Sequence, residues 1–394
     1  LFIGILYWLT APLVYRQAKR VTDGYYPKRR TRLSQEAMVL ELVRWRLWNQ
    51  RIAQEKFARP GQVTAWFGAM QAQDYASVRW AVALRCADAT NATIEQAIID
   101  KTIVRTWLLR GTLHITAAAD VRWLLALLGP RLINGSAGRH RQLELDDATL
   151  ARSHDTLAQA LHGGQLCTRA DVMAALQQAG IATAGQRGYH LLHHAGMQGL
   201  ICFGPSQGKQ ETFVLLDDWV PPGRPMAREE ALAELAARYF RSHGPATLPD
   251  YLWWSGLTAV EARAGLEAVK HQFERATIGD ETYWLPQHNA NPQDPSPTAY
   301  LLPAFDEYFL GYQSRRAVLD SRYNQQVVSS NGIFRPMVVM DGQIVGIWKQ
   351  ALKKDLVRIT PELFKPLTST EWQALQLAIA QYGAFLGVTA VLAA

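Results

Sequence analysis

Two glutamines separated by one small residue, Gln71-Ala72-Gln73, form the segment with the clearest potential for chemistry. Side chains two residues apart do not share a face of a helix, but they point to the same side of an extended segment. If both glutamines serve one site, the segment must interrupt the helical pattern around it. A neutral amide is a poor general base, but it can orient water and place its carbonyl dipole near a positive charge. The alternative is a pair of surface amides at a helix junction.

Histidines provide a second set of candidates. His114 closes residues 110–114, Arg-Gly-Thr-Leu-His, and can contact a phosphate or a base, although a single strand histidine is more often structural. His190 and His194 have the i, i+4 spacing that helical zinc ligands can adopt. No glutamate follows the first of them, and no nearby carboxylate or cysteine completes a site. We therefore expect no metal, and we expect His190, His193 and His194 on a solvated or nucleic-acid-facing helix.

Paired carboxylates at Asp306 and Glu307 can in general perform acid–base chemistry. Adjacent residues of a strand point apart, so we do not expect these two to share a site. The sequence lacks a GxGxxG motif, a P-loop, a nucleophile elbow and a Cys/His zinc signature. Nucleotide cofactors, NTP hydrolysis and zinc-dependent deamination are therefore disfavoured, and we expect no cofactor.

The charge distribution favours a polyanionic partner such as nucleic acid. The 394 residues carry 41 Lys and Arg against 34 Asp and Glu, a net charge of +7. Part of this surplus lies in residues 1–36, but a second basic stretch lies in residues 101–141, where Asp120 is the one acidic residue. We expect this stretch to form a phosphate-binding stripe. The candidate contacts to DNA are Arg105, Arg110, His114, Arg139, Arg141 and Lys209.

The first residues look unlike the rest of the chain. Residues 1–15 are nearly all apolar and precede a basic run, which is the reverse of a secretory signal. The apolar run is shorter than the roughly 20 residues of a membrane-spanning helix. We interpret residues 1–37 as an over-extended reading frame or a dispensable tail, and a membrane-surface anchor is the alternative. Three widely spaced cysteines favour a reducing cytoplasm.

The hydrophobic periodicity places these residues in repeated units of helices followed by strands, which is typical of winged helix-turn-helix domains. The first unit has expected helices over 38–58, 63–70, 76–84 and 94–100 and strands within 104–116. The second has helices over 153–161, 169–178 and 186–198 and strands over 200–203 and 212–216. The third has helices over 229–240, 249–254 and 258–269 and strands over 273–278 and 281–285. We expect Pro60-Gly61 to end the first helix, Thr168 to cap the helix that begins at Arg169, and Thr258 and Glu261 to form a capping box.

We therefore predict an α+β fold of three tandem winged helix-turn-helix units and a C-terminal β-rich domain with a terminal helix. A hairpin turn at Asp341-Gly342 and a helix over 371–382 belong to the last domain. The predicted boundaries are 1–37 for the extension, 38–150, 151–222 and 223–298 for the three units, and 299–394 for the β-rich domain. A proline-rich linker closes the third unit.

Several fragments, taken in their order along the chain, resemble the winged-helix DNA glycosylases of the AlkZ/YcaQ type over roughly residues 38–394. The fragments are Met70-Gln71-Ala72-Gln73, residues 105–114, Leu302-Pro303-Ala304-Phe305-Asp306, residues 331–336, Asp341-Gly342 and Gly346-Ile347-Trp348-Lys349. The resemblance implies the same architecture of three winged helices and a β domain. The family's catalytic motif, Gln, an apolar residue, then Gln or Asp, maps onto Gln71, Ala72 and Gln73. Its second Gln is similar to the AlkZ-like branch, and Asp74 directly after it is a further candidate.

The resemblance implies a monofunctional DNA glycosylase that hydrolyses the N-glycosidic bond of cationic alkylated purines. N7-alkylguanine and N3-alkyladenine leave readily without protonation, so the enzyme needs mainly to position water and stabilise an oxocarbenium sugar. Unhooking of interstrand crosslinks through such purines is implied as well. We expect double-stranded DNA as partner, no stable protein partner, a monomer and a cytoplasmic location. The alternatives are a non-catalytic winged-helix transcription regulator, which would leave alkylated DNA intact, and a tandem-wing scaffold for proteins.

Overall fold

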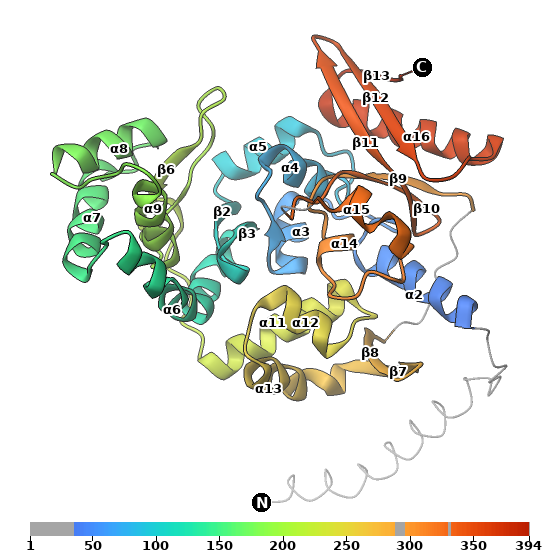
Figure 1. Cartoon of the computed structure of the whole chain (residues 1–394), viewed down its shortest axis with the longest axis horizontal. Coiled ribbons are helices and arrows are strands. Elements are labelled where there is room, and N and C mark those ends of the chain that lie inside the picture. The colour runs from blue at the N-terminus through green and yellow to red at the C-terminus, as the bar shows by residue number, and fades with distance from the viewer. Residues whose placement is uncertain (1–34, 288–295, 330–331, 394) are drawn as a thin grey trace, which may run out of the picture. The chain divides into compact units, whose positions relative to one another are not determined.

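The computed structural model describes residues 35–287, 296–329 and 332–393, with the side chains described from residue 38 (Figure 1). The contacts separate Leu1–Val39 from Leu40–Ala394, and the elements that position the candidate site belong to the second of these units. The expectations for residues 1–34 and most of the proline-rich linker lie outside the described residues. Within the described residues no helix is both long and apolar enough to cross a membrane.

The first group of elements has the predicted order, with two boundary corrections. It comprises α2 (Gln35–Asn49), α3 (Pro60–Phe67), α4 (Tyr75–Ala83), α5 (Asn91–Ile99) and the hairpin of β2 (Ile103–Trp107) and β3 (Leu113–Ala117). The helix expected over 38–58 ends at Asn49, because Arg51 adopts a left-handed φ of 59°. Pro60 begins α3 instead of ending the preceding helix, since proline suits the first helical turn.

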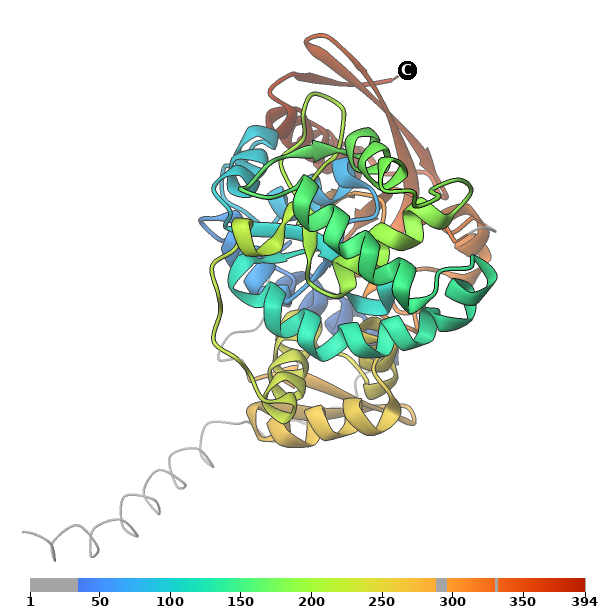
Figure 2. The ribbon, with the colours of Figure 1, turned by 90° about the vertical axis from the view of Figure 1, so that its left-hand side faces the viewer.

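The second group follows a helix that the sequence pattern did not reveal. Helix α6 (Ala118–Gln142) runs from the first hairpin to α7 (Asp147–Ala160), α8 (Arg169–Gln178), α9 (Arg187–Met197) and the strands β5 (Ile201–Phe203) and β6 (Thr212–Leu215). Figures 1 and 2 show α7, α8 and α9 gathered together. The predicted cap is confirmed, because Thr168 accepts a hydrogen bond from the backbone N–H of Asp171.

The third group repeats the order of helices and hairpin. It consists of α11 (Arg228–His243), α12 (Leu248–Ser255), α13 (Ala259–Val269), β7 (Phe273–Ile278) and β8 (Glu281–Pro286). The predicted capping box is present, because Thr258 and Glu261 exchange hydrogen bonds at the start of α13. The expected mixture of helices and sheets is therefore confirmed, and the order of helices and hairpin recurs in each group.

The first two hairpins belong to one sheet. Among the described residues it has six strands in the order β1-β3-β2-β5-β6-β4, with β1 (Met70–Gln71) and β4 (Cys167–Thr168) at its edges. The pairing of Arg105 with Phe203 joins the hairpins. Residues far apart in the sequence are thereby held in one rigid layer beside the glutamine segment.

The C-terminal strands share a hydrophobic core with the first helices. In the described chain they form a five-stranded sheet, β9 (Ala299–Leu302), β10 (Met337–Met340), β11 (Gln343–Lys353), β12 (Leu356–Leu363) and β13 (Thr389–Leu392). Helix α16 (Ser369–Leu386) packs on it. Trp80 of α4 and Trp348 of β11 donate their indole N–H groups to the carbonyls of Leu301 and Leu302 at 2.7 and 2.9 Å.

A buried ion pair joins the same two regions. Arg85, directly after α4, makes two parallel hydrogen bonds of 2.9 Å to the carboxylate of Asp306, and both side chains are fully buried. The remaining guanidinium N–H groups donate to the backbone and side-chain oxygens of Gln50 and to the carbonyl of Ala81. All five guanidinium donors of Arg85 are therefore satisfied, which is the condition for a buried ion pair to be tolerated.

Removing one member of this pair should destabilise the fold strongly. We expect Arg85→Met to lower the free energy of unfolding by about 3–5 kcal/mol, because it leaves the Asp306 charge buried without a partner. The double variant Arg85→Met/Asp306→Leu should be close to the wild type, since no charge is then left buried. Urea unfolding measures both, and equal losses in the single and double variants would contradict the account. Asp320→Asn, in an exposed pair, is the control expected to show no change.

Candidate active site

The glutamine segment interrupts the helical pattern, with a strand end at Gln71 and a bend at Gln73, as both glutamines serving one site would require. Gln71 ends β1 at the edge of the sheet, where it pairs with His114 of β3. The backbone N–H of Ala72 continues this pairing by donating to the carbonyl of Leu113 at 2.7 Å. Directly opposed residues of an antiparallel pair place their side chains on the same face of the sheet, so Gln71 and His114 are neighbours.

The two glutamines have different surroundings. Gln71 is buried, and its side-chain oxygen accepts a hydrogen bond from the Thr112 hydroxyl at 3.2 Å. Gln73 is exposed. Asp74 is exposed as well, and its carboxylate caps α4 by accepting a hydrogen bond of 2.8 Å from the backbone N–H of Ser77. The segment thus presents one fixed amide and one accessible amide.

Glu307 holds the glutamine segment by a hydrogen bond to its backbone. This residue begins the short helix α14 (Glu307–Leu310), and its Oε1 accepts the backbone N–H of Gln71 at 2.8 Å. Its Oε2 accepts the indole N–H of Trp254 at 3.0 Å and lies 3.3 Å from Nε2 of His243. Asp306 binds Arg85 instead, so the two adjacent carboxylates do not share a site, as predicted from the sequence.

The electrostatics favour a charged Glu307 beside a neutral His243. Burial by itself would raise the pKa of Glu307, but the hydrogen bonds from His243 and from the Gln71 backbone outweigh it and lower the pKa below its usual value. Burial lowers the pKa of His243 despite the neighbouring carboxylate. A carboxylate that accepts several N–H groups is thus held ionised directly behind Gln71.

Arg105 fixes the middle of the segment. Its Nε donates to the carbonyl of Ala72 at 3.1 Å, and its Nη1 pairs with Glu211 at 2.5 Å. The side chain is 5% exposed and lies over the rings of Tyr75 and Phe203. Arg105, which we expected among the DNA contacts, is therefore buried and ties the glutamine segment to the second hairpin.

The side chains of Arg110 and His114 also bond to backbone carbonyls inside the protein. Arg110 adopts a left-handed φ of 55° in the turn between β2 and β3 and donates to the carbonyls of Trp253 and Trp254. His114 is 1% exposed, and its Nδ1 lies 2.9 Å from the carbonyl of Thr112, which assigns the proton to Nδ1. Burial, reinforced by the charge of Arg110, lowers the pKa of His114 to about 4.

The histidines of α9 do not form a solvated face, which corrects the expectation for that helix. His193 and His194 are buried, and His190 is half-buried. His194 stacks on His154 of α7 with a nitrogen-to-nitrogen distance of 3.0 Å, and it contacts the ring of His140 of α6. Burial lowers the pKa of all these imidazoles, that of His194 to about 4. Across the described residues no cluster is arranged to hold a metal ion.

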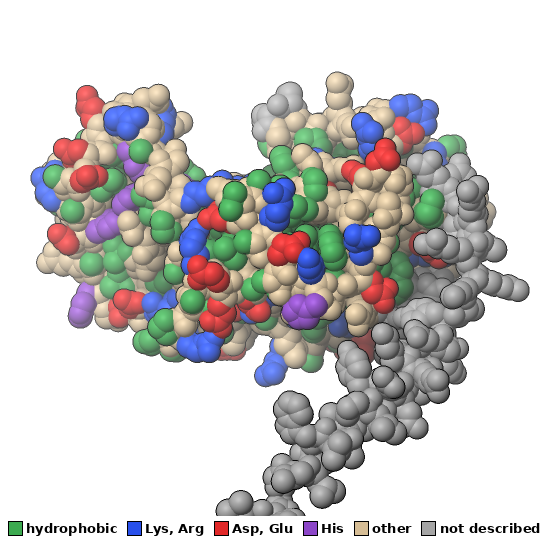
Figure 3. All heavy atoms as spheres, turned by 90° about the horizontal axis from the view of Figure 1, so that it is seen from below, with side chains coloured by type: hydrophobic (Ala, Val, Ile, Leu, Met, Phe, Trp, Pro, Cys, Tyr) green, Lys and Arg blue, Asp and Glu red, His purple; other side chains and the backbone are tan. Residues whose placement is uncertain are grey.

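The basic residues of 101–141 do not form one exposed stripe. Asp217 and two carbonyls bind Arg122, and Asp120 binds Arg238 of α11. On the face drawn in Figure 3, Lys and Arg side chains alternate with Asp and Glu. Of the predicted contacts, Arg139, Arg141 and Lys209 are exposed. Arg139 bonds to the amides of Gln142 and Gln186, which leave its charge uncancelled.

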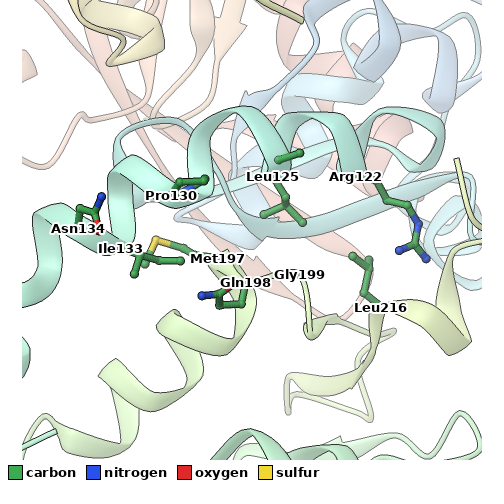
Figure 4. A pocket seen from close by; sticks show the side chains of 10 residues that line it. Arg122, Leu125, Pro130, Ile133, Asn134, Met197, Gln198, Gly199 and Leu216 are labelled. Carbon is green, nitrogen blue, oxygen red and sulfur yellow. The ribbon is translucent and has the colours of Figure 1, made fainter. Parts of the chain in front are cut away.

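A separate cavity of about 470 Å³ lies between α6 and the end of α9 (Figure 4). Among the described residues around it, Arg122 is the one titratable group, and its guanidinium is already engaged. Neither glutamine lines this cavity. It offers no group for acid–base or nucleophilic chemistry, so we place the candidate site at the glutamine segment.

The buried His114 should make stability depend on pH. The pKa of His114 is lowered in the folded state. The unfolded chain therefore binds a proton at His114 below pH 6.5, whereas the folded protein binds it only near pH 4. The titration of His114 should therefore lower the free energy of unfolding by about 2 kcal/mol between pH 7 and pH 5. His114→Gln should remove that part of the pH dependence in urea unfolding. The exposed His271→Gln is the control, and an unaltered pH dependence in His114→Gln would contradict the assignment.

Comparisons with known proteins point to one family. The family model described as DNA glycosylase AlkZ-like matches residues 64–385. An interstrand DNA cross-link repair glycosylase of Streptomyces sahachiroi is 23% identical over 355 residues, which cover 85% of this chain and 94% of that protein. The structure of the DNA glycosylase AlkZ of Streptomyces sahachiroi matches with a TM-score of 0.73 and 21% identity, over 90% of this chain and 99% of that one.

The family model therefore points to a DNA glycosylase and does not favour a transcription regulator. The family match includes the glutamine segment, the first two hairpins and Glu307. On this evidence the chain belongs to the AlkZ-like DNA glycosylase family and is a DNA glycosylase.

Proposed function

We propose that the protein hydrolyses the N-glycosidic bond of cationic alkylated purines in double-stranded DNA, N7-alkylguanine and N3-alkyladenine, with Gln71 and Gln73 as the catalytic residues. The observation that carries the proposal is the glutamine segment, in which Gln73 is exposed and Gln71 is held through both its side chain and its backbone. The name of the Streptomyces sahachiroi relative supports extending the proposal to crosslinks joined through such purines.

The chemistry suits two amides. The alkylated purine already carries a positive charge, so the C1′–N9 bond can break as its electrons neutralise the leaving base. Water then adds its oxygen to C1′ and releases its proton to solvent. Gln73 orients this water, and Gln71 directs its carbonyl dipole toward the developing oxocarbenium sugar. The ionised Glu307 behind Gln71 adds negative potential at the same place, where a positive charge develops.

DNA is held by the three groups of helices and hairpins, which we propose are winged helices. The exposed Arg139, Arg141 and Lys209 supply phosphate contacts in this proposal, with Lys209 in the turn of the second hairpin. Arg105, Arg110 and His114 act instead by fixing the glutamine segment, because each of them already bonds to a backbone carbonyl inside the protein. The protein acts as a monomer without a cofactor.

An excision assay tests the proposed reaction. Wild-type protein should release the modified base from a duplex that contains N7-methylguanine and leave an abasic site. Gln71→Ala and Gln73→Ala should each lower the single-turnover rate by about 10²-fold, which is the typical effect of losing one aligned dipole. No release by the wild type would contradict the function, and full activity in both variants would contradict the motif. A crosslinked duplex, assayed in parallel, tests unhooking.

The role of Glu307 can be separated from simple stability. Glu307→Gln removes the charge and replaces one carboxylate oxygen by an NH₂ group. The N–H of either Gln71 or Trp254 then faces a donor instead of an acceptor. We expect the excision rate to fall by about 10-fold to 10²-fold with duplex affinity unchanged. Asp120→Asn is the matched control, because it alters a largely buried, ion-paired carboxylate that bonds to Arg238 and not to Gln71. Rates are compared per folded molecule, at a temperature where circular dichroism shows both variants folded. Equal rates in the two variants would contradict the role of Glu307.

A further inference from the structure

A cavity of about 310 Å³ begins one residue beyond the exposed Gln73. The start of α4 borders it on one side, with Asp74 and Ala76. Residues 303–305 and 333–336 border it on the other side, together with β11 and α16, which α4 contacts (Figure 1). Residues 303–305, after β9, and residues 333–336, before β10, belong to the fragments that support the family resemblance. They therefore meet beside the catalytic segment.

The walls of this cavity are largely aromatic. Trp80, Trp348 and Tyr382 form its buried side, and Tyr382 packs edge-on against both indoles with ring centroids 5.1 and 5.0 Å apart. The indole N–H groups are already bonded to carbonyls, so the two tryptophans offer carbon surface. Phe305 and Phe334 are half-buried and lie 5.7 Å apart at another wall.

The mouth of the cavity combines apolar surface with isolated charges. Ile333 is 48% exposed there and adds apolar surface to the mouth. Asp74 and Arg335 are exposed charges of opposite sign, and Lys349 pairs with Glu362. The opposing charges do not favour a phosphate. Aromatic walls of this kind favour a flat apolar group that stacks on them.

We propose that this cavity is a subsite for the flat, apolar part of a bulky alkyl group attached to the target purine. The inference rests on the proposed function, because a substituent on the purine extends away from the sugar that the glutamines address. The position of the cavity directly after Gln73 places the substituent there while the C1′–N9 bond breaks. The enzyme then gains affinity for aromatic adducts that a methyl group does not provide.

The test compares a small and a bulky lesion in the same duplex, N7-methylguanine and N7-benzylguanine. Ile333→Asp places a charge at the mouth and should lower kcat/KM for the benzyl lesion by about tenfold, with the methyl lesion changed less than about twofold. Ile333→Leu should restore the benzyl rate. Ala76→Trp, at an exposed lining position, should produce the same selective loss by filling the cavity. Val260→Asp is the matched control, because Val260 is 77% exposed on α13 and does not line the cavity.

The outcomes separate the subsite from the reaction. Equal losses for both lesions in Ile333→Asp and Ala76→Trp, or no loss for either, would overturn the subsite while leaving the glycosylase function in place. Equal losses would also be the result if a neighbouring base, and not the substituent, occupied the cavity. Release of neither lesion by the wild type would overturn the proposed function and the subsite with it.

Discussion

The buried pair of Arg85 and Asp306 is the constraint on which the site depends. It joins the end of α4 to the start of α14, two segments separated by 221 positions in the chain. Asp306 also accepts the backbone N–H of Tyr308 and so fixes the first turn of α14. Glu307 lies between these two anchored positions, and its carboxylate accepts the backbone N–H of Gln71. A buried charged pair thereby anchors the backbone on both sides of the residue that bonds to the glutamine segment.

The glutamine segment itself lies on an edge strand, and this position suits its role. An edge strand leaves one row of backbone groups unpaired. In β1 these groups bind side chains, with the N–H of Gln71 on Glu307 and the carbonyl of Ala72 on Arg105. Arg105 contacts the second hairpin, and Trp254 of the third group binds Glu307. Arg105 and Glu307, the two residues that hold the segment, therefore connect it to the second and third groups of helices and hairpins.

The sequence pattern predicted the ends of helices and strands well where neighbouring residues determine them. Capping residues such as Thr168 and Thr258, and the turn at Asp341-Gly342, predicted element boundaries well because each acts through neighbours in sequence. It failed for α6, whose 25 residues include Pro130 and bury one face against other groups. It also failed for the end of α2, because the left-handed turn at Arg51 has no glycine or proline to mark it.

The sequence alone determined the class of fold, the order of helices and hairpins and, through resemblance, the family. Only the tertiary structure decided which basic residues face solvent and which are buried, because burial depends on partners more than 30 residues away, such as Ala72 and Glu211 for Arg105. It alone assigned Glu307 to Gln71, since no spacing rule relates residues 236 positions apart. Local sequence carries propensity and caps, whereas the meeting of distant side chains is set by packing.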